Sequence, residues 1–109
     1  MVDKNLPENW LICRDKSEWR EWLAANHLKE SGVWVQIRKI KSKDTGIFLR
    51  EAVDEAICFG WIDGQMFSLD DKKYIIRMAP RRKGSMWSLI NRKRAEELIA
   101  EGLMTQAGL

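Results

Sequence analysis

Apolar residues recur every three to four positions in three segments of the chain, which is the spacing of a helix that buries one face. The predicted helices cover residues 16–27, 50–59 and 86–101. Asp15 and Glu18 have the spacing of an N-terminal capping pair for the first helix. Gly60 and Gly102 follow the second and third helices, at the position where a left-handed C-terminal cap is common.

Three other segments have the pattern of strands. Apolar β-branched residues alternate with other side chains over residues 33–40, and two further extended runs cover residues 62–69 and 74–79. The polar residues 70–73 separate the last two runs by the length of a hairpin turn, and Pro80 ends the second of them. We therefore expect a single α+β domain, a small antiparallel sheet of about three strands packed by about three helices that cover one face.

The composition is that of one folded domain. The chain has 109 residues, of which 45% are hydrophobic and 32% are charged, so burial of apolar surface can offset the entropy lost on folding. No apolar stretch is long enough to span a membrane, and the N-terminus lacks the apolar segment of a signal peptide. We expect a cytoplasmic protein without membrane insertion.

Thiol and imidazole groups are too few for a metal centre. Cys13 and Cys58 are the two cysteines and His27 is the one histidine, whereas a zinc site needs about four ligands. We expect no metal, no cofactor and two free, buried thiols. Cys58, His27 and Asp63 are the residue types of a nucleophilic enzyme, but burial raises a thiol pKa and a histidine after a helix more often caps it.

Positive charge is concentrated near the C-terminus. The chain has 19 basic and 16 acidic residues, and residues 72–109 hold nine of the basic ones but three of the acidic ones. A local field of one sign attracts a partner of the opposite charge. Arg81 and Arg82 closely precede Ser85, the predicted cap of the last helix, where free backbone N–H groups favour an anion.

Two polar residues stand out beside this predicted anion site. Asn91 lies on the apolar stripe of the last helix with Trp87, and its amide must be hydrogen-bonded either to a ligand or to a loop carbonyl. Asp63 is expected near Pro80 and Arg81 in the hairpin. Its carboxylate would orient an arginine for a ligand or would only hold the loop in place.

Two stretches of the chain are similar to a known family. They run from Cys58 to Gly64, with the sequence Cys-Phe-Gly-Trp-Ile-Asp-Gly, and from Ala79 to Asn91, which contains Pro-Arg and Trp-Ser-Leu-Ile-Asn. They resemble the bacteriocin-protection family, also called the YdeI/OmpD-associated family. The opening Trp19-x-x-Trp22-Leu23, the segment Glu51 to Ala56 and the tail Glu101 to Met104 also look like the family, so the resemblance covers residues 14–108.

The resemblance implies one YdeI/OmpD-associated-like domain over residues 1–109. The chain departs from the family at Leu49-Arg50, where an aromatic-containing segment is expected, and at Leu109, beyond which many members continue into a further helical region. We therefore expect a domain without the family's C-terminal helical region.

The expected function is that of a non-enzymatic binding protein of the bacteriocin-protection type, linked to resistance against antimicrobial stress. The resemblance implies no reaction and no catalytic residue. The partner would be a protein or an anionic ligand held by a basic surface lined with Trp and Arg. The residues expected to form this surface are Trp61, Asp63, Arg77, Arg81, Arg82, Ser85, Trp87, Ser88 and Asn91.

Two other functions fit the same residues. The basic surface suits a single-stranded nucleic acid if Trp61, Tyr74 and Trp87 offer faces for base stacking, although six tryptophans in a small domain are most simply core. The basic residues would alternatively be an ordinary solvated face. The third function is an enzyme of unrecognised reaction.

Overall fold

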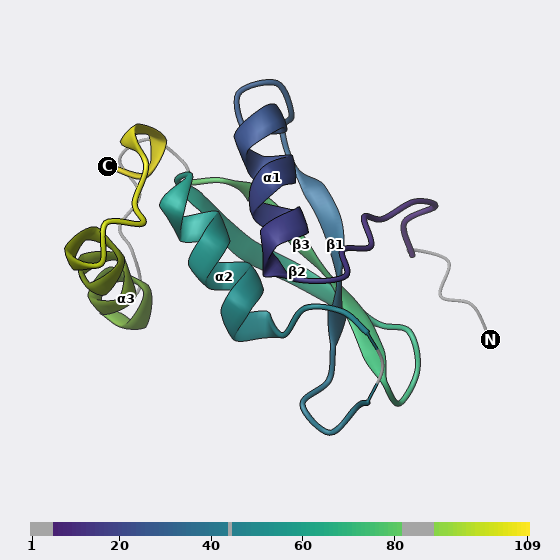
Figure 1. The fold of residues 1–109 in the computed structure, drawn as a ribbon. Helices are drawn as coiled ribbons and strands as arrows, with labels where there is room; N and C mark the ends of the chain where they lie inside the picture. The colour runs from purple at the N-terminus through teal and green to yellow at the C-terminus, as the bar shows by residue number, and fades with distance from the viewer. Residues whose placement is uncertain (1–5, 44, 82–88) are drawn as a thin grey trace.

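Three helices and three strands make up the part of the chain that the computed structural model describes, which is residues 6–43, 45–81 and 89–109 (Figure 1). The order is α1 (Lys16–Asn26), β1 (Val33–Arg38), α2 (Leu49–Cys58), β2 (Trp61–Ser68), β3 (Lys73–Pro80), α3 (Leu89–Ala100) and the short 3-10 helix η1 (Gln106–Gly108). The predicted α+β arrangement is confirmed. The predicted start of the last helix at residue 86 lies outside the described residues.

The three strands form one antiparallel sheet in the order β1-β3-β2. In this register Val35 lies opposite Ile76, and Asp63 lies opposite Met78. The pairing of β2 with β3 shifts between Asp63 and Met66, which marks a β-bulge. A bulge bends its strand and changes the direction of the side chains beside it. We therefore expect β2 to bend directly after Asp63.

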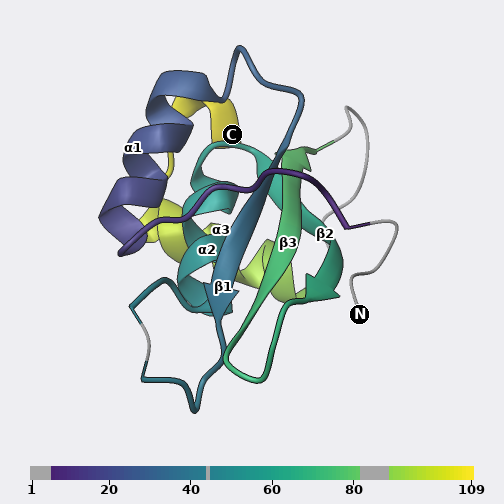
Figure 2. The ribbon, with the colours of Figure 1, turned by 90° about the vertical axis from the view of Figure 1, so that its right-hand side faces the viewer.

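The helices lie on one side of the sheet, as predicted, and α2 is the central helix. It packs against α1, α3, β1, β2 and η1, whereas α3 packs on α2. Figure 1 shows α3 on the far side of α2 from the strands. The segment before α1 runs past the opposite side of the sheet (Figure 2), and Leu11 forms a parallel bridge with Val35.

The core lies between α1, α2 and the sheet. Trp19 and Leu23 of α1 and Ile76 of β3 are fully buried in it. The indole N–H of Trp19 donates to the carbonyl of Ala52 at 2.9 Å, because a buried indole needs an acceptor. This bond joins α1 to α2. No helix in the described part of the chain is long and apolar enough to cross a membrane.

Local signals in the sequence set most of the element ends. The Asp15 carboxylate accepts from the backbone N–H of Glu18 at 3.0 Å, as the capping pair predicted. Gly60 and Gly102 have φ angles of +75° and +76°, which confirms the left-handed caps. The strand predicted over residues 33–40 is shorter than expected, because the ladder with β3 ends where Arg38 pairs with Lys73.

The residues after α3 close over the C-terminal end of α2. Both the backbone N–H and the hydroxyl of Thr105 donate to the carbonyl of Cys58, at 3.0 and 2.5 Å. Arg20 of α1 donates to the carbonyl of Leu103 at 2.8 Å and pairs with Glu55 at 2.7 Å. The carbonyl of Cys58 at the end of α2 thus finds its partner in the C-terminal segment.

Candidate functional site

A cleft of about 510 Å³ lies where α2, β2 and α3 meet. This volume is within the range of small-molecule and peptide pockets, roughly 300–1,000 Å³. Its described lining is apolar with three polar residues. The lining residues are Ile40, Leu49, Arg50, Val53, Asp63, Ile90 and Asn91. The cleft thereby brings together Asp63 and Asn91, which are far apart in the sequence.

Asp63 comes from the inward face of the sheet. Alternation along β2 places it on the same face as Trp61, but further along the strand. The phenol of Tyr74 has a raised pKa, chiefly because it is partly buried and additionally because the Asp63 carboxylate is nearby. Asp63 therefore contributes a carboxyl group to the lining of the cleft.

The position of α3 sets the place of Asn91. Ala95 and Leu98 of α3 are buried against the rest of the protein. The guanidinium of Arg94 donates two hydrogen bonds to the carboxylate of Asp54 on α2, from Nε at 2.8 Å and from Nη2 at 2.9 Å. This pair raises the pKa of Arg94, so Arg94 stays charged. Bidentate pairs of this kind fix the relative orientation of the two side chains as well as stabilise the fold. Asn91 lies one turn before Arg94, so the same pair positions it relative to α2.

Apolar side chains form the mouth and the wall of the cleft. Leu49 and Val53 of α2 are half-buried and pack against the core. Ile40 and Ile90 line the same cleft and are 87% and 72% exposed. Exposed apolar side chains gathered around a concavity are typical of a binding site.

The structure describes five of the residues that the sequence predicted for the site, and two of them line the cleft. Trp61 is 1% exposed and packs edge-on against Trp22 in the core. Arg77 follows the buried Ile76 and is on the opposite face of the sheet, beside Gly32. Arg81 follows β3, and its N–H donates to the carbonyl of Gly60 at 2.8 Å. The predicted residues Arg82, Ser85, Trp87 and Ser88 lie outside the described residues.

The fold neutralises part of the positive charge that the sequence concentrates near the C-terminus. Arg94 forms ion pairs with Asp54, Glu97 and Glu101. Arg92 lies 3.8 Å from Glu96, at the exposed surface of α3. Arg94 therefore attaches α3 to α2, and its charge is already matched by carboxylates.

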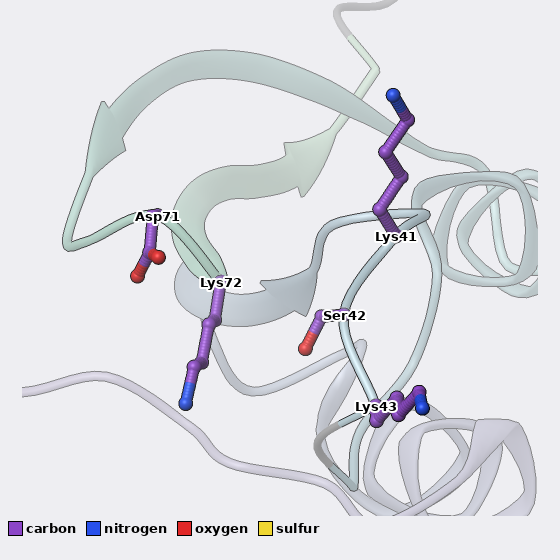
Figure 3. Close-up of a pocket in the computed structure, with 5 residues that line it drawn as sticks. All are labelled: Lys41, Ser42, Lys43, Asp71 and Lys72. Atoms are coloured by element: carbon purple, nitrogen blue, oxygen red, sulfur yellow. The ribbon is translucent and has the colours of Figure 1, made fainter.

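A cluster of lysines, which the sequence analysis missed, lies at the other end of the sheet. Figure 3 shows this lysine hollow, a depression of about 430 Å³ between the loop after β1 and the turn between β2 and β3. It is lined by Lys41, Ser42, Lys43, Asp71 and Lys72. The pairing of Arg38 with Lys73 in the sheet brings the two loops together. Strand pairing was the missing signal, because each loop alone has only the composition of a polar turn.

A third depression connects these two places. The middle hollow, of about 400 Å³, shares Ile40 and Leu49 with the cleft and shares Lys41 and Asp71 with the lysine hollow. Its other described lining residues are Arg38, Lys39 and Tyr74. The three depressions thus follow one another along one side of the molecule.

The two thiols are buried in the protein and the histidine caps a helix. Cys13 and Cys58 are free and buried, as predicted. Burial raises the pKa of Cys13 to about 11, and burial also raises the pKa of Cys58. His27 caps α1, with its backbone N–H and ring Nδ1 both bonded to the carbonyl of Leu23. Among the described residues no group of three or more His, Cys, Asp or Glu side chains is placed to hold a metal ion.

Comparison with known proteins assigns the chain to a family. A family model described as "Domain of unknown function (DUF8412)" matches residues 11–109. No curated protein and no solved structure matches the chain.

Proposed function

Because the chain belongs to the DUF8412 family, whose description gives no function, we propose a function from the residues of the cleft. The chain is a non-enzymatic binding protein of the bacteriocin-protection, YdeI/OmpD-associated type. Its partner binds in the cleft between α2, β2 and α3.

The lining of the cleft is the observation that carries this proposal. Leu49, Val53 and the exposed Ile90 line it with apolar surface, and Asp63 and Asn91 add a carboxyl group and an amide. Ligand sites in proteins commonly combine an apolar lining with a few polar groups that fix orientation. The same lining lacks a paired nucleophile and base among the described residues, and such a pair is what nucleophilic catalysis needs.

The two stretches that resemble the bacteriocin-protection family both lead to this cleft. Asp63 belongs to the stretch from Cys58 to Gly64, and Asn91 ends the stretch from Ala79. Segments that are far apart in the sequence thus each supply a polar residue to one cavity. This convergence supports a shared binding role for the two stretches.

A survival assay tests the proposal. Bacteria that express the chain are challenged with a panel of purified bacteriocins, and the surviving fraction is counted against bacteria that lack it. We expect protection by the unmodified chain and a loss of about tenfold or more with Asp63→Asn or Ile90→Asp, which alter the cleft.

The matched control is Glu21→Gln, an equal change of charge on an exposed residue of α1. It should protect as well as the unmodified chain. Full protection by both cleft variants would contradict the role of the cleft. Absence of protection against every bacteriocin of the panel would contradict the bacteriocin-protection type.

A further inference from the structure

We infer that the cleft, the middle hollow and the lysine hollow form one groove, and that its partner is a peptide segment in which apolar residues are followed by acidic ones. The apolar part lies in the cleft and the acidic part lies over the lysines. This inference rests on the proposed function and names the chemistry of the partner.

The continuity of the groove follows from its shared walls. Ile40 and Leu49 line both the cleft and the middle hollow, and Lys41 and Asp71 line both the middle hollow and the lysine hollow. The two loops at the lysine end are fastened to each other. The backbone N–H of Lys39 donates to the carbonyl of Lys72 at 2.8 Å, and its ammonium group donates to the carbonyl of Asp70 at 2.7 Å. These two hydrogen bonds therefore fix the two loops relative to each other in the unbound protein.

The lysines of the hollow are not paired with carboxylates of the described part of the protein. Lys41, Lys43 and Lys72 are exposed, and none of them forms an ion pair with any residue that the structure describes. Arg20 and Arg94 are paired with carboxylates. Asp71 is the single acidic residue of the described lining. The described lining therefore carries a net positive charge, which attracts an anionic partner.

The directions of the lysines favour an extended partner over a small anion. The ammonium groups of Lys41, Lys43 and Lys72 point in three different directions in Figure 3. Groups that diverge in this way do not close around one phosphate or carboxylate. They suit several negative charges that are spread along a chain.

The apolar half of the groove favours a peptide over a nucleic acid. Ile40 is 87% exposed and stands between the apolar cleft and Lys41. Single-stranded nucleic acids use open aromatic faces for base stacking. Here the ring of Phe48 is covered by the guanidinium of Arg38, whose Cζ lies 4.4 Å from the ring centroid, and Tyr74 is partly buried. Aliphatic side chains beside carboxylates match what the described groove offers.

A titration followed by backbone-amide NMR tests this inference on the full chain. The probe is the peptide acetyl-Leu-Val-Leu-Gly-Glu-Glu-Glu-Glu-amide, and two control peptides carry Gln or Lys in place of Glu. We expect the Glu peptide to shift amides of residues 39–43 and 72 together with those of residues 49–53, 63 and 90–91. Its affinity should exceed that of the Gln peptide by about tenfold at low salt and should fall as salt screens the lysines.

The double variant Lys41→Glu, Lys72→Glu should lose about tenfold or more in affinity for the Glu peptide. Its control is Lys16→Glu, Lys29→Glu, which makes the same charge change on exposed lysines outside the groove, and this control should bind like the unmodified chain. Equal binding of the Glu and Gln peptides, with shifts in the cleft alone, would overturn this inference and leave the proposed function standing.

Two other outcomes also overturn the inference. The first is a mixed-sequence single-stranded oligonucleotide that shifts the groove at lower concentration than the Glu peptide, which would assign the groove to nucleic acid. The second is the absence of saturable shifts with every peptide. In both cases the survival assay still judges the proposed function, because it depends on Asp63 and Ile90 and not on the lysines.

Discussion

Gly60 lies against the carbonyl oxygen of Ala107, so closely that a Cβ on Gly60 would stand 2.6 Å from this oxygen. Gly60 also has a φ of +75°, in the left-handed region. A glycine is therefore required here twice, once for the turn from α2 into β2 and once for the space that η1 occupies. The contact joins the central helix to the C-terminal segment.

The first prediction separates these two requirements. Gly60→Ala and Gly102→Ala both place a side chain at the same φ, which costs roughly 1–2 kcal/mol, but a Cβ at Gly102 meets no atom within 4 Å. We expect Gly60→Ala to lower the free energy of unfolding by about 2 kcal/mol more than Gly102→Ala. Urea unfolding measures both. Equal losses would mean that the segment around Ala107 moves away freely.

The second prediction concerns the attachment of α3 to α2. Arg94→Ala leaves the partly buried Asp54 without its two hydrogen bonds, so the free energy of unfolding should fall by about 1–3 kcal/mol. The control is Arg92→Ala, because the pair with Glu96 is 68% exposed on both sides and is 3.8 Å long. Exposed pairs contribute little. Thermal and urea unfolding should therefore detect the first change and not the second.

The third prediction concerns pH. Burial raises the pKa of Cys13 from 9.0 to about 11, so the unfolded chain releases this proton at lower pH than the folded chain does. The stabilisation is complete below pH 9 and is lost as the pH rises toward 11, by about 2–3 kcal/mol.

Comparison with Cys13→Ala isolates the effect of this thiol, because the other titratable groups are the same in both proteins. The difference in free energy of unfolding between the two proteins should shrink from pH 8.5 to pH 11. A constant difference would contradict the raised pKa.

The fourth prediction concerns Ile90→Asp, the variant chosen for the survival assay. Ile90 is 72% exposed, and an acidic residue in the first turn of a helix is favoured by the helix dipole. The free energy of unfolding should change by less than about 0.5 kcal/mol. Circular dichroism with urea unfolding checks this, and a large loss would disqualify the variant as a probe of the cleft.

Much of the fold follows from the sequence because each element carries its own periodic signal. The stripe of Trp19 and Leu23 and the capping Asp15 need only local rules. The end of β1 is different, because Lys39 and Ile40 continue the strand pattern while their partner strand begins only at Lys73. A strand ends where its partner strand ends, and the local sequence of β1 does not say where β3 begins.

The candidate site was predictable only in part. Asn91 stands out as a polar residue on an apolar stripe, and Asp63 follows from its stretch of sequence. Alternation alone also indicates that Arg77 faces away from Ile76 and Met78, and hence away from the cleft. Prediction of the lysine hollow would have required knowing which loops the sheet brings together.

The closure of α2 by Thr105 has a consequence for the order of events during biosynthesis. Thr105 and Cys58 are 47 positions apart, and a ribosome that adds about 5–20 residues per second takes a few seconds to cover this distance. Throughout this interval the carbonyl of Cys58 faces water or a chaperone. The cap on the carbonyl of Cys58 therefore forms only after Thr105 has been synthesised.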